Sequence, residues 1–104
     1  MDLQALKRDV ENIALACLQR KVHVRITGQT LEVDDGFLLI PEGARITVGQ
    51  VHILPTPEGQ AEEIETLGQF SRAEAITTVM TEIFRSDFLQ DLEDKAMAEA
   101  FGQG

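Results

Sequence analysis

The stretch that decides the fold is residues 21–55, KVHVRITGQTLEVDDGFLLIPEGARITVGQVHILP. Apolar and polar residues alternate over residues 22–27, which is the pattern of a strand with one buried face. The Gly28-Gln29 dipeptide suits a two-residue hairpin turn of type II′, and this turn places Arg25 opposite Glu32. Aliphatic side chains then meet on one face and opposite charges meet on the other. The sequence therefore predicts this register for the first hairpin.

A second turn is predicted at Asp35-Gly36, a dipeptide typical of type I′ turns. This turn sets Val33 opposite Leu38. In that register Phe37 and Leu39 lie on the outer face of the sheet, beside the acidic side chains of the preceding strand. An apolar strand on that face is expected to be covered by a helix or by a second subunit.

The rest of the sheet is predicted from its turns. Pro41-Glu42-Gly43 is expected to end the third strand, because proline cannot donate to a ladder and glycine permits a positive φ. Residues 44–48 and 51–54 are then expected to form another hairpin around Gly49-Gln50. Residues 61–67 are acidic and ambiguous between strand and helix, and a sixth strand is the preferred reading.

The first helix is predicted over residues 2–20, which carry apolar side chains at helical spacing. Asp2 is the expected N-cap. Cys17 falls on the apolar stripe, so it is expected to be a buried core residue rather than a reactive thiol.

The C-terminal part, residues 71–101, is predicted to contain two helices. Ser71 and Glu74 form a capping box that opens the first of them. Ser86 or Asp87 is expected to cap the second after a break in the chain. Together these elements predict a single α+β domain over residues 1–104, with a meander of five or six antiparallel strands over residues 21–67. The meander is either a curved sheet or a small, partly open barrel.

Charge is distributed unevenly along the chain, whose net charge is −9. Residues 1–56 hold seven acids and six bases, which gives −1, whereas residues 57–104 hold eleven acids and three bases, which gives −8. Direct nucleic-acid binding is not expected, because phosphate contact needs clustered Lys and Arg. The acidic half is expected to attract a basic or amphipathic protein partner.

Cysteine content and hydropathy indicate the cellular setting. A single cysteine excludes an internal disulfide and a cysteine-based zinc cluster within one chain. Residues 1–20 lack the apolar run of a signal peptide, and no apolar run is long enough to span a membrane. We therefore expect a cytoplasmic protein that does not bind membranes.

Two histidines and one acid are the candidates for chemistry. His23 and His52 each follow a valine and are expected to point outward from a strand, and Asp34 lies opposite His23. Were the first and fifth strands to close a barrel, the three side chains would be able to share a metal or act as an acid and base pair. No two-histidine motif occurs locally, so the sequence predicts no catalytic residue, no cofactor and no metal site.

The function that the sequence predicts is a small, non-enzymatic protein-binding module, such as an adaptor, a chaperone or a regulatory subunit. The candidate partner-binding residues are Phe37 and Leu39 on the sheet, and Asp91, Glu93 and Asp94 on the last helix. A homodimer is expected, because a domain of this size has a stability of only about 5 to 15 kcal/mol and leaves an apolar strand to cover.

Two alternatives remain open from the sequence. The protein is either an acidic nucleic-acid mimic that inhibits a DNA- or RNA-processing enzyme, or, less favoured, a small enzyme or metal protein that uses His23, Asp34 and His52.

Overall fold

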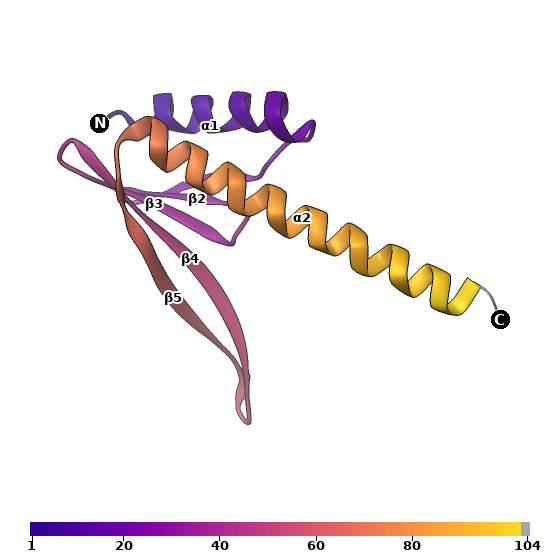
Figure 1. Ribbon diagram of the computed structural model, residues 1–104. Helices are drawn as coiled ribbons and strands as arrows, with labels where there is room; N and C mark the ends of the chain where they lie inside the picture. The colour runs from indigo at the N-terminus through magenta and orange to yellow at the C-terminus, as the bar shows by residue number, and fades with distance from the viewer. Residues whose placement is uncertain (103–104) are drawn as a thin grey trace.

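The structure is a computed structural model that describes residues 1–102 (Figure 1). Two helices and five strands occur in the order α1, β1, β2, β3, β4, β5, α2, and their bounds are Leu3–Leu18, Val24–Thr27, Thr30–Val33, Phe37–Glu42, Arg45–Thr56, Gly59–Phe70 and Arg72–Gly102. The strands form one antiparallel sheet in sequence order. The α+β class and the meander are confirmed, and the sheet is open rather than closed into a barrel.

The first hairpin has the register that the sequence predicts. Arg25 pairs with Glu32, and Val24 pairs with Val33. Gly28 has a φ of +61°, which fits the first central position of a type II′ turn. The prediction succeeds here because both strands and their turn lie in one short stretch, where pairing chemistry is local.

The second turn differs from the prediction by one residue. Residues 34 and 35 both have a φ of 54°, and the Gly36 amide donates to the Val33 carbonyl at 3.1 Å. The type I′ turn is therefore centred on the two aspartates, and Gly36 is an additional bulge residue. As a result Val33 pairs with Phe37 rather than with Leu38.

This shift reverses the two faces of β3. Phe37 and Leu39 are 6% and 0% exposed and lie in the core, so their predicted position on the outer face is wrong. Leu38 and Ile40 are half-buried and lie on the outer face instead. The observed register is favoured because it places the phenyl ring, the largest side chain of the strand, under the helices rather than in water.

Strand β3 also continues beyond its predicted end. Pro41 lies inside the strand and pairs with Ile46, and the turn is confined to Gly43-Ala44. Glu42 and Arg45 flank this two-residue turn, so the backbone nitrogen of position 41 points away from β4. Proline is tolerated because the pairing with β2 ends before this point.

The predicted hairpin around Gly49-Gln50 is wrong, because β4 runs without interruption from Arg45 to Thr56. The chain turns at Pro57-Glu58 instead, and Thr56 pairs with Gly59. Residues 61–67 lie in β5, which confirms their strand assignment and makes the number of strands five. Strand β5 pairs with β4 along its whole length, and this ladder outweighs the local turn preference of one glycine.

A β-bulge at Leu67 changes the alternation of β5. The ladder pairs Val48 with Gly68 and the next residue of β4 with Thr66, so Leu67 has no partner across the ladder. Leu67 packs against the core. Beyond the bulge, the reversed alternation places Ile64 on the outer face of the sheet.

Both helices cover the same face of the sheet, which we call the inner face (Figure 1). One continuous core lies between them and the strands. Its buried side chains are Leu6, Val10, Ala14, Val22, Val24, Leu31, Val33, Phe37, Leu39, Ile46, Val48, Ala75, Ile76, Val79, Met80 and Ile83.

The start of α1 is as predicted, since the Asp2 carboxylate accepts a hydrogen bond from the Gln4 amide at 3.0 Å. Its end differs, because Cys17 is exposed rather than buried. Residues at intervals of four lie in one row on a helix, and the row through Val10 and Ala14 continues to Leu18. Leu18 therefore takes the core position that the sequence assigns to Cys17.

The C-terminal part is one helix of 31 residues, so the predicted break at Ser86 or Asp87 is wrong. Its start is correct, because the Ser71 hydroxyl accepts from the Glu74 amide at 3.3 Å and donates to the Glu74 carboxylate at 3.0 Å. Asp87 does not cap a helix, because its carboxylate is bound by Arg20. Asp87 thus forms a long-range ion pair with Arg20 instead of the expected N-cap of a second helix.

The molecule is extended for its size. Its radius of gyration is 16.0 Å and its dimensions are 56 × 39 × 20 Å, whereas a compact domain of this length has a radius of gyration of about 13 Å. Two elements project from the body in different directions, the far half of α2 and the hairpin end of β4 and β5 (Figure 1). Each of them presents side chains that have no core to enter.

Candidate protein-binding surfaces

The first candidate surface lies on the outer face of the β4–β5 arm, defined here as residues 51–64. The β3–β4 ladder ends at Phe37 and Gln50, and one further hydrogen bond joins the Val51 amide to the Gly36 carbonyl at 2.8 Å, so β4 and β5 pair with each other alone beyond Val51. The side chains of Ile53 and Ile64 are 58% and 57% exposed on this arm. These two exposed side chains make the outer face of the arm a candidate surface for contact with another molecule.

A shallow depression of about 290 Å³ is centred on these side chains. Half of its lining residues are apolar and half are charged, and we call the charged residues its rim. The lining residues are Leu38, Val51, Ile53 and Ile64, with Arg25, Glu32, Asp35 and Glu62 around them. A side chain with an apolar stem and a positive end would match both parts of this surface.

The arm is strongly acidic. No Lys or Arg occurs between Arg45 and Arg72, whereas Glu58, Glu62, Glu63 and Glu65 all lie in that interval. The depression therefore has an excess of negative charge, with Arg25 as its one cation against three acids.

The cation at the rim is already paired. The Arg25 guanidinium donates to the Glu32 carboxylate at 2.9 Å, and Asp35 lies 3.9 Å away. Hydrogen bonding with Glu32 raises the pKa of Arg25. Both ion pairs of Arg25 are made with Glu32 and Asp35, and neither is made with Glu62, which also lines the depression.

The three candidates for chemistry are not brought together. His23 N donates to Asp34 Oδ1 at 3.0 Å through its backbone, whereas His52 Nε2 lies 2.9 Å from Glu65 Oε2. Strands β2 and β3 separate β1 from β4, which removes the barrel that would place the two histidines side by side. Over residues 1–102, no group of three or more His, Cys, Asp or Glu side chains is arranged to hold a metal ion.

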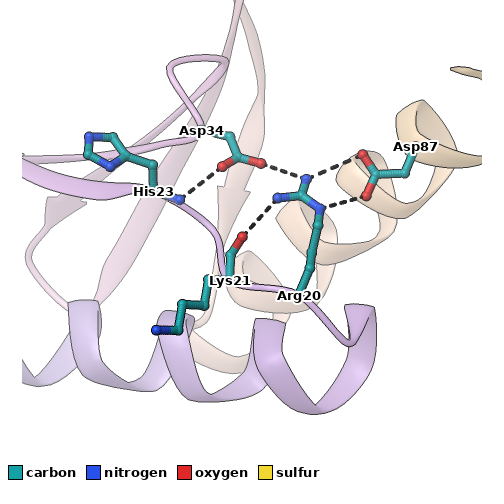
Figure 2. Close-up of polar contacts among 5 residues, drawn as sticks. All are labelled: Arg20, Lys21, His23, Asp34 and Asp87. Atoms are coloured by element: carbon teal, nitrogen blue, oxygen red, sulfur yellow. Dashed lines mark hydrogen bonds and ion pairs between the residues drawn. The ribbon is translucent and has the colours of Figure 1, made fainter.

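The base of the projecting part of α2 is held by an ion-pair cluster (Figure 2). Arg20 lies between two carboxylates: its Nε donates to Asp87 at 2.9 Å, and its Nη2 donates to Asp34 at 2.8 Å and to Asp87 at 3.3 Å. Nη1 donates to the Lys21 carbonyl at 3.0 Å. The hydrogen bonds with Asp87 and then Asp34 hold the pKa of Arg20 above its usual range, so the residue stays positively charged.

This cluster joins three elements that are far apart in the sequence. Arg20 follows α1, Asp34 lies in the β2–β3 turn, and Asp87 lies in α2, 67 residues from Arg20. A second ion pair, Asp9 with Arg72, joins α1 to the start of α2. The direction in which α2 leaves the body is therefore fixed at two points, one on α1 and one in the segment that follows it.

We expect the substitution Arg20→Gln to lower the free energy of unfolding by about 1 kcal/mol, because it leaves two carboxylates without their cation. The loss is limited by solvent, since the side chains of Arg20 and Asp87 are 38% and 45% exposed. Urea denaturation followed by circular dichroism measures the change. Arg8→Gln is the matched control, because Arg8 is an exposed residue of α1 that lies outside the cluster. Equal losses in the two variants would show that the cluster does not hold α2.

A second candidate surface is the groove between α1 and α2, which has a volume of about 300 Å³. Its lining residues are Ile13, Cys17, Leu18, Thr77, Met80, Thr81 and Phe84. The hydroxyls of Thr77 and Thr81 donate to the backbone carbonyls of Ala73 and Thr77 at 2.9 and 2.8 Å. Because these hydroxyls are used within the helix, the groove is mostly apolar.

The third candidate surface is the projecting half of α2, where Asp91, Glu93 and Asp94 are exposed as the sequence predicts. Asp94 accepts a hydrogen bond from Gln90 within the helix at 3.1 Å. Large apolar side chains are also exposed there, namely Phe84 (59%), Phe88 (53%), Leu89 (52%), Leu92 (48%) and Met97 (58%). The rings of Phe84 and Phe88 stack on each other, with centroids 6.5 Å apart.

The structure thus separates the predicted partner-binding residues. The three acids lie on α2, and Phe37 and Leu39 lie in the core. Sequence reasoning missed Ile53 and Ile64, because the expected hairpin around Gly49-Gln50 placed Ile53 inside.

Comparison with known proteins finds no matching family model, no matching curated protein and no matching solved structure. Within the part of the chain that the structure describes, neither helix has both the length and the apolar character that crossing a membrane requires.

Proposed function

We propose that this protein is a non-enzymatic protein-binding module whose β4–β5 arm binds a basic, amphipathic segment of a partner protein. The observation that carries the proposal is the outer face of the arm. Ile53 and Ile64 are more than half exposed there, and the surrounding interval of the chain contains acids but no Lys or Arg. Apolar contact supplies affinity for such a segment, and the acids select its charge.

The free edge of β5 supports the same occupant. β5 has 12 residues and is the last strand of the sheet, so its outer backbone groups are not paired within the sheet. A partner segment in extended conformation can bind to such an edge and place alternate side chains on the apolar depression. The length of the edge makes this mode geometrically possible for a segment of several residues.

The charges on the arm disfavour a second copy of this chain at the same edge. Glu58, Glu62, Glu63 and Glu65 lie along β5 or its turn. Two such edges in contact would bring like charges together, and charged edge strands oppose sheet-to-sheet association for this reason. The occupant is therefore expected to be a different protein that carries Lys or Arg.

We expect a fluorescent ten-residue peptide of alternating lysine and valine to bind the protein, and Ile64→Asp to weaken binding by at least tenfold. Loss of one apolar contact of about 1.5 kcal/mol or more corresponds to that factor. Fluorescence anisotropy measures the affinity. A peptide of alternating glutamate and valine should not bind.

Two charge reversals make the matched comparison. Glu62→Lys changes the rim of the depression, whereas Glu63→Lys changes the overall charge equally but lies on the other face of β5. We expect the first to weaken peptide binding more than the second. Equal effects would mean that the peptide senses only the net charge, and the proposal for this surface would be wrong.

The nucleic-acid mimic is distinguished by competition. A tagged protein is used to capture its partner from nuclease-treated lysate of the source cell, and the captured protein is then challenged with duplex DNA. The proposed module is supported if the captured protein stays bound in the presence of duplex DNA and if the Ile64→Asp variant fails to capture it. If duplex DNA releases the captured protein, this chain was occupying the nucleic-acid site of that protein. The chain would then be a nucleic-acid mimic, and the proposed module would be wrong.

A further inference from the structure

The core-facing stripe of α2 changes its chemistry where the helix leaves the body. Ile76, Met80 and Ile83 are buried and are spaced by four and three residues. The same spacing continues through the next turns to Asp87 and Gln90, which are polar. The projecting half of α2 is therefore not an extension of the core-facing stripe.

Leu89, Leu92 and Ala96 of the projecting half lie on the opposite face of the helix, whereas Met97 lies in line with the core-facing stripe. Positions 85, 89, 92, 96 and 99 are spaced by four and three residues, which is the spacing of a seam between two packed helices. They are occupied by Arg85, Leu89, Leu92, Ala96 and Glu99. These five residues define the α2 seam, and the exposed Phe88 lies beside it.

The α2 seam is complementary to itself when it is read in the opposite direction. With Leu92 at the centre, Leu92 meets Leu92 of the second copy, and Leu89 lies about 1.5 Å along the helix axis from the level of Ala96, so a large side chain faces a small one in each outer layer. At both ends Arg85 meets Glu99 of the second copy, so opposite charges face each other.

Charges beside the seam agree with this arrangement. Lys95 and Asp91 lie on the same flank, and antiparallel pairing brings Lys95 of one copy near Asp91 of the other. The two cations of this half of the helix thus both gain acids from the second copy. Parallel pairing would instead place Arg85 beside Arg85 and Glu99 beside Glu99, which is repulsive.

We propose that two copies of this chain associate through antiparallel pairing of their α2 seams, centred on Leu92. The seam faces away from the sheet, so the body of neither copy obstructs the second helix. Pairing covers Leu89 and Leu92, which are 52% and 48% exposed in the single chain. It also gives Arg85 a partner better placed than its present 3.6 Å contact with Glu82, in which its side chain is 64% exposed. This surface is separate from the arm, so the inference does not depend on the proposed function.

The first test is the mass of the full chain in solution. Light scattering at about 50 µM is expected to give twice the chain mass of 11.5 kDa. Leu92→Glu is expected to raise the dimer dissociation constant at least 100-fold, because it places two buried like charges in contact at the centre. Gln90→Glu adds the same charge on the opposite face of α2 and is expected to leave the dimer intact. A monomeric natural chain, or a dimer unaffected by Leu92→Glu, overturns the proposal.

The second test fixes the direction of pairing by disulfide formation in a Cys17→Ser background. Leu92→Cys is expected to form an intermolecular disulfide, because the two positions meet. Arg85→Cys alone should not do so, since its two copies lie on the order of 20 Å apart along the antiparallel pair. A mixture of Arg85→Cys and Glu99→Cys should crosslink. A disulfide in Arg85→Cys alone, or none in Leu92→Cys, overturns antiparallel pairing.

Discussion

The substitution Leu39→Ala is expected to lower the free energy of unfolding by about 3 kcal/mol, within the range found when a buried leucine is truncated. Leu39 is 0% exposed and packs between the sheet and the helices. Truncation removes apolar contacts and leaves a cavity that the surrounding strands can fill only partly. Urea denaturation monitored by circular dichroism measures the loss as a shift in the midpoint at constant slope.

The neighbouring residue is the control for this prediction. Ile40 is half-buried on the outer face, and Ile40→Ala is expected to destabilise the protein by about 1 kcal/mol. The register predicted from a turn at Asp35-Gly36 would give the opposite order, with Ile40 inside and Leu39 outside. A larger loss for Ile40→Ala than for Leu39→Ala would therefore show that β3 has that register in solution.

The second large effect is expected at the bulge of β5. Gly68 has a φ of +147°, and a Cβ atom at this position would lie 3.0 Å from the Phe70 ring. Gly68→Asn is therefore expected to lower stability by about 2 kcal/mol, from backbone strain together with displacement of the ring. Thermal and urea denaturation both report this loss.

Gly43→Asn is the matched substitution. Gly43 has a φ of +64°, and no atom lies within 4 Å of the position that a Cβ atom would occupy there. Asparagine tolerates this left-handed conformation, so the loss is expected to stay below about 1 kcal/mol. If the two variants were equally stable, the bulge would not need glycine at position 68.

The parts of the fold that the sequence predicts correctly are those decided by neighbours in the chain. Arg25 and Glu32 belong to one hairpin, and Ser71 and Glu74 belong to one turn of helix. Each pair is close in the sequence, so side-chain chemistry alone identifies the contact.

The errors arise where a distant segment competes with a local preference. Asp87 has the residue type of a helix cap, but Arg20 binds it from a position 67 residues away. Gly49 has the residue type of a turn, but it pairs with Leu38 on one side and Thr66 on the other. In both cases tertiary contacts override the local signal, which single-sequence reasoning cannot weigh.

The candidate surfaces show the same division. The acids at positions 91, 93 and 94 are exposed as predicted, because this part of α2 projects from the body and its side chains lie in solvent. The predicted face of Phe37 and Leu39 is wrong because the turn before them is shifted by one residue. The face on which a side chain lies depends on the register of its strand, and here that register depends on whether Gly36 belongs to the two-residue turn or is an additional bulge residue.

The bulge at Leu67 decides which side chains the arm presents on each of its faces. Because alternate residues of a strand point to opposite sides, one additional residue at the base of β5 exchanges the faces of everything beyond it. With the bulge, Ile64 lies outside and Glu63 and Glu65 lie inside. Gain or loss of one residue at the bulge would replace Glu62 and Ile64 with Glu63 and Glu65 on the outer face of β5. A change in length by one residue, with no change in the composition of the arm, would thus make this face more acidic.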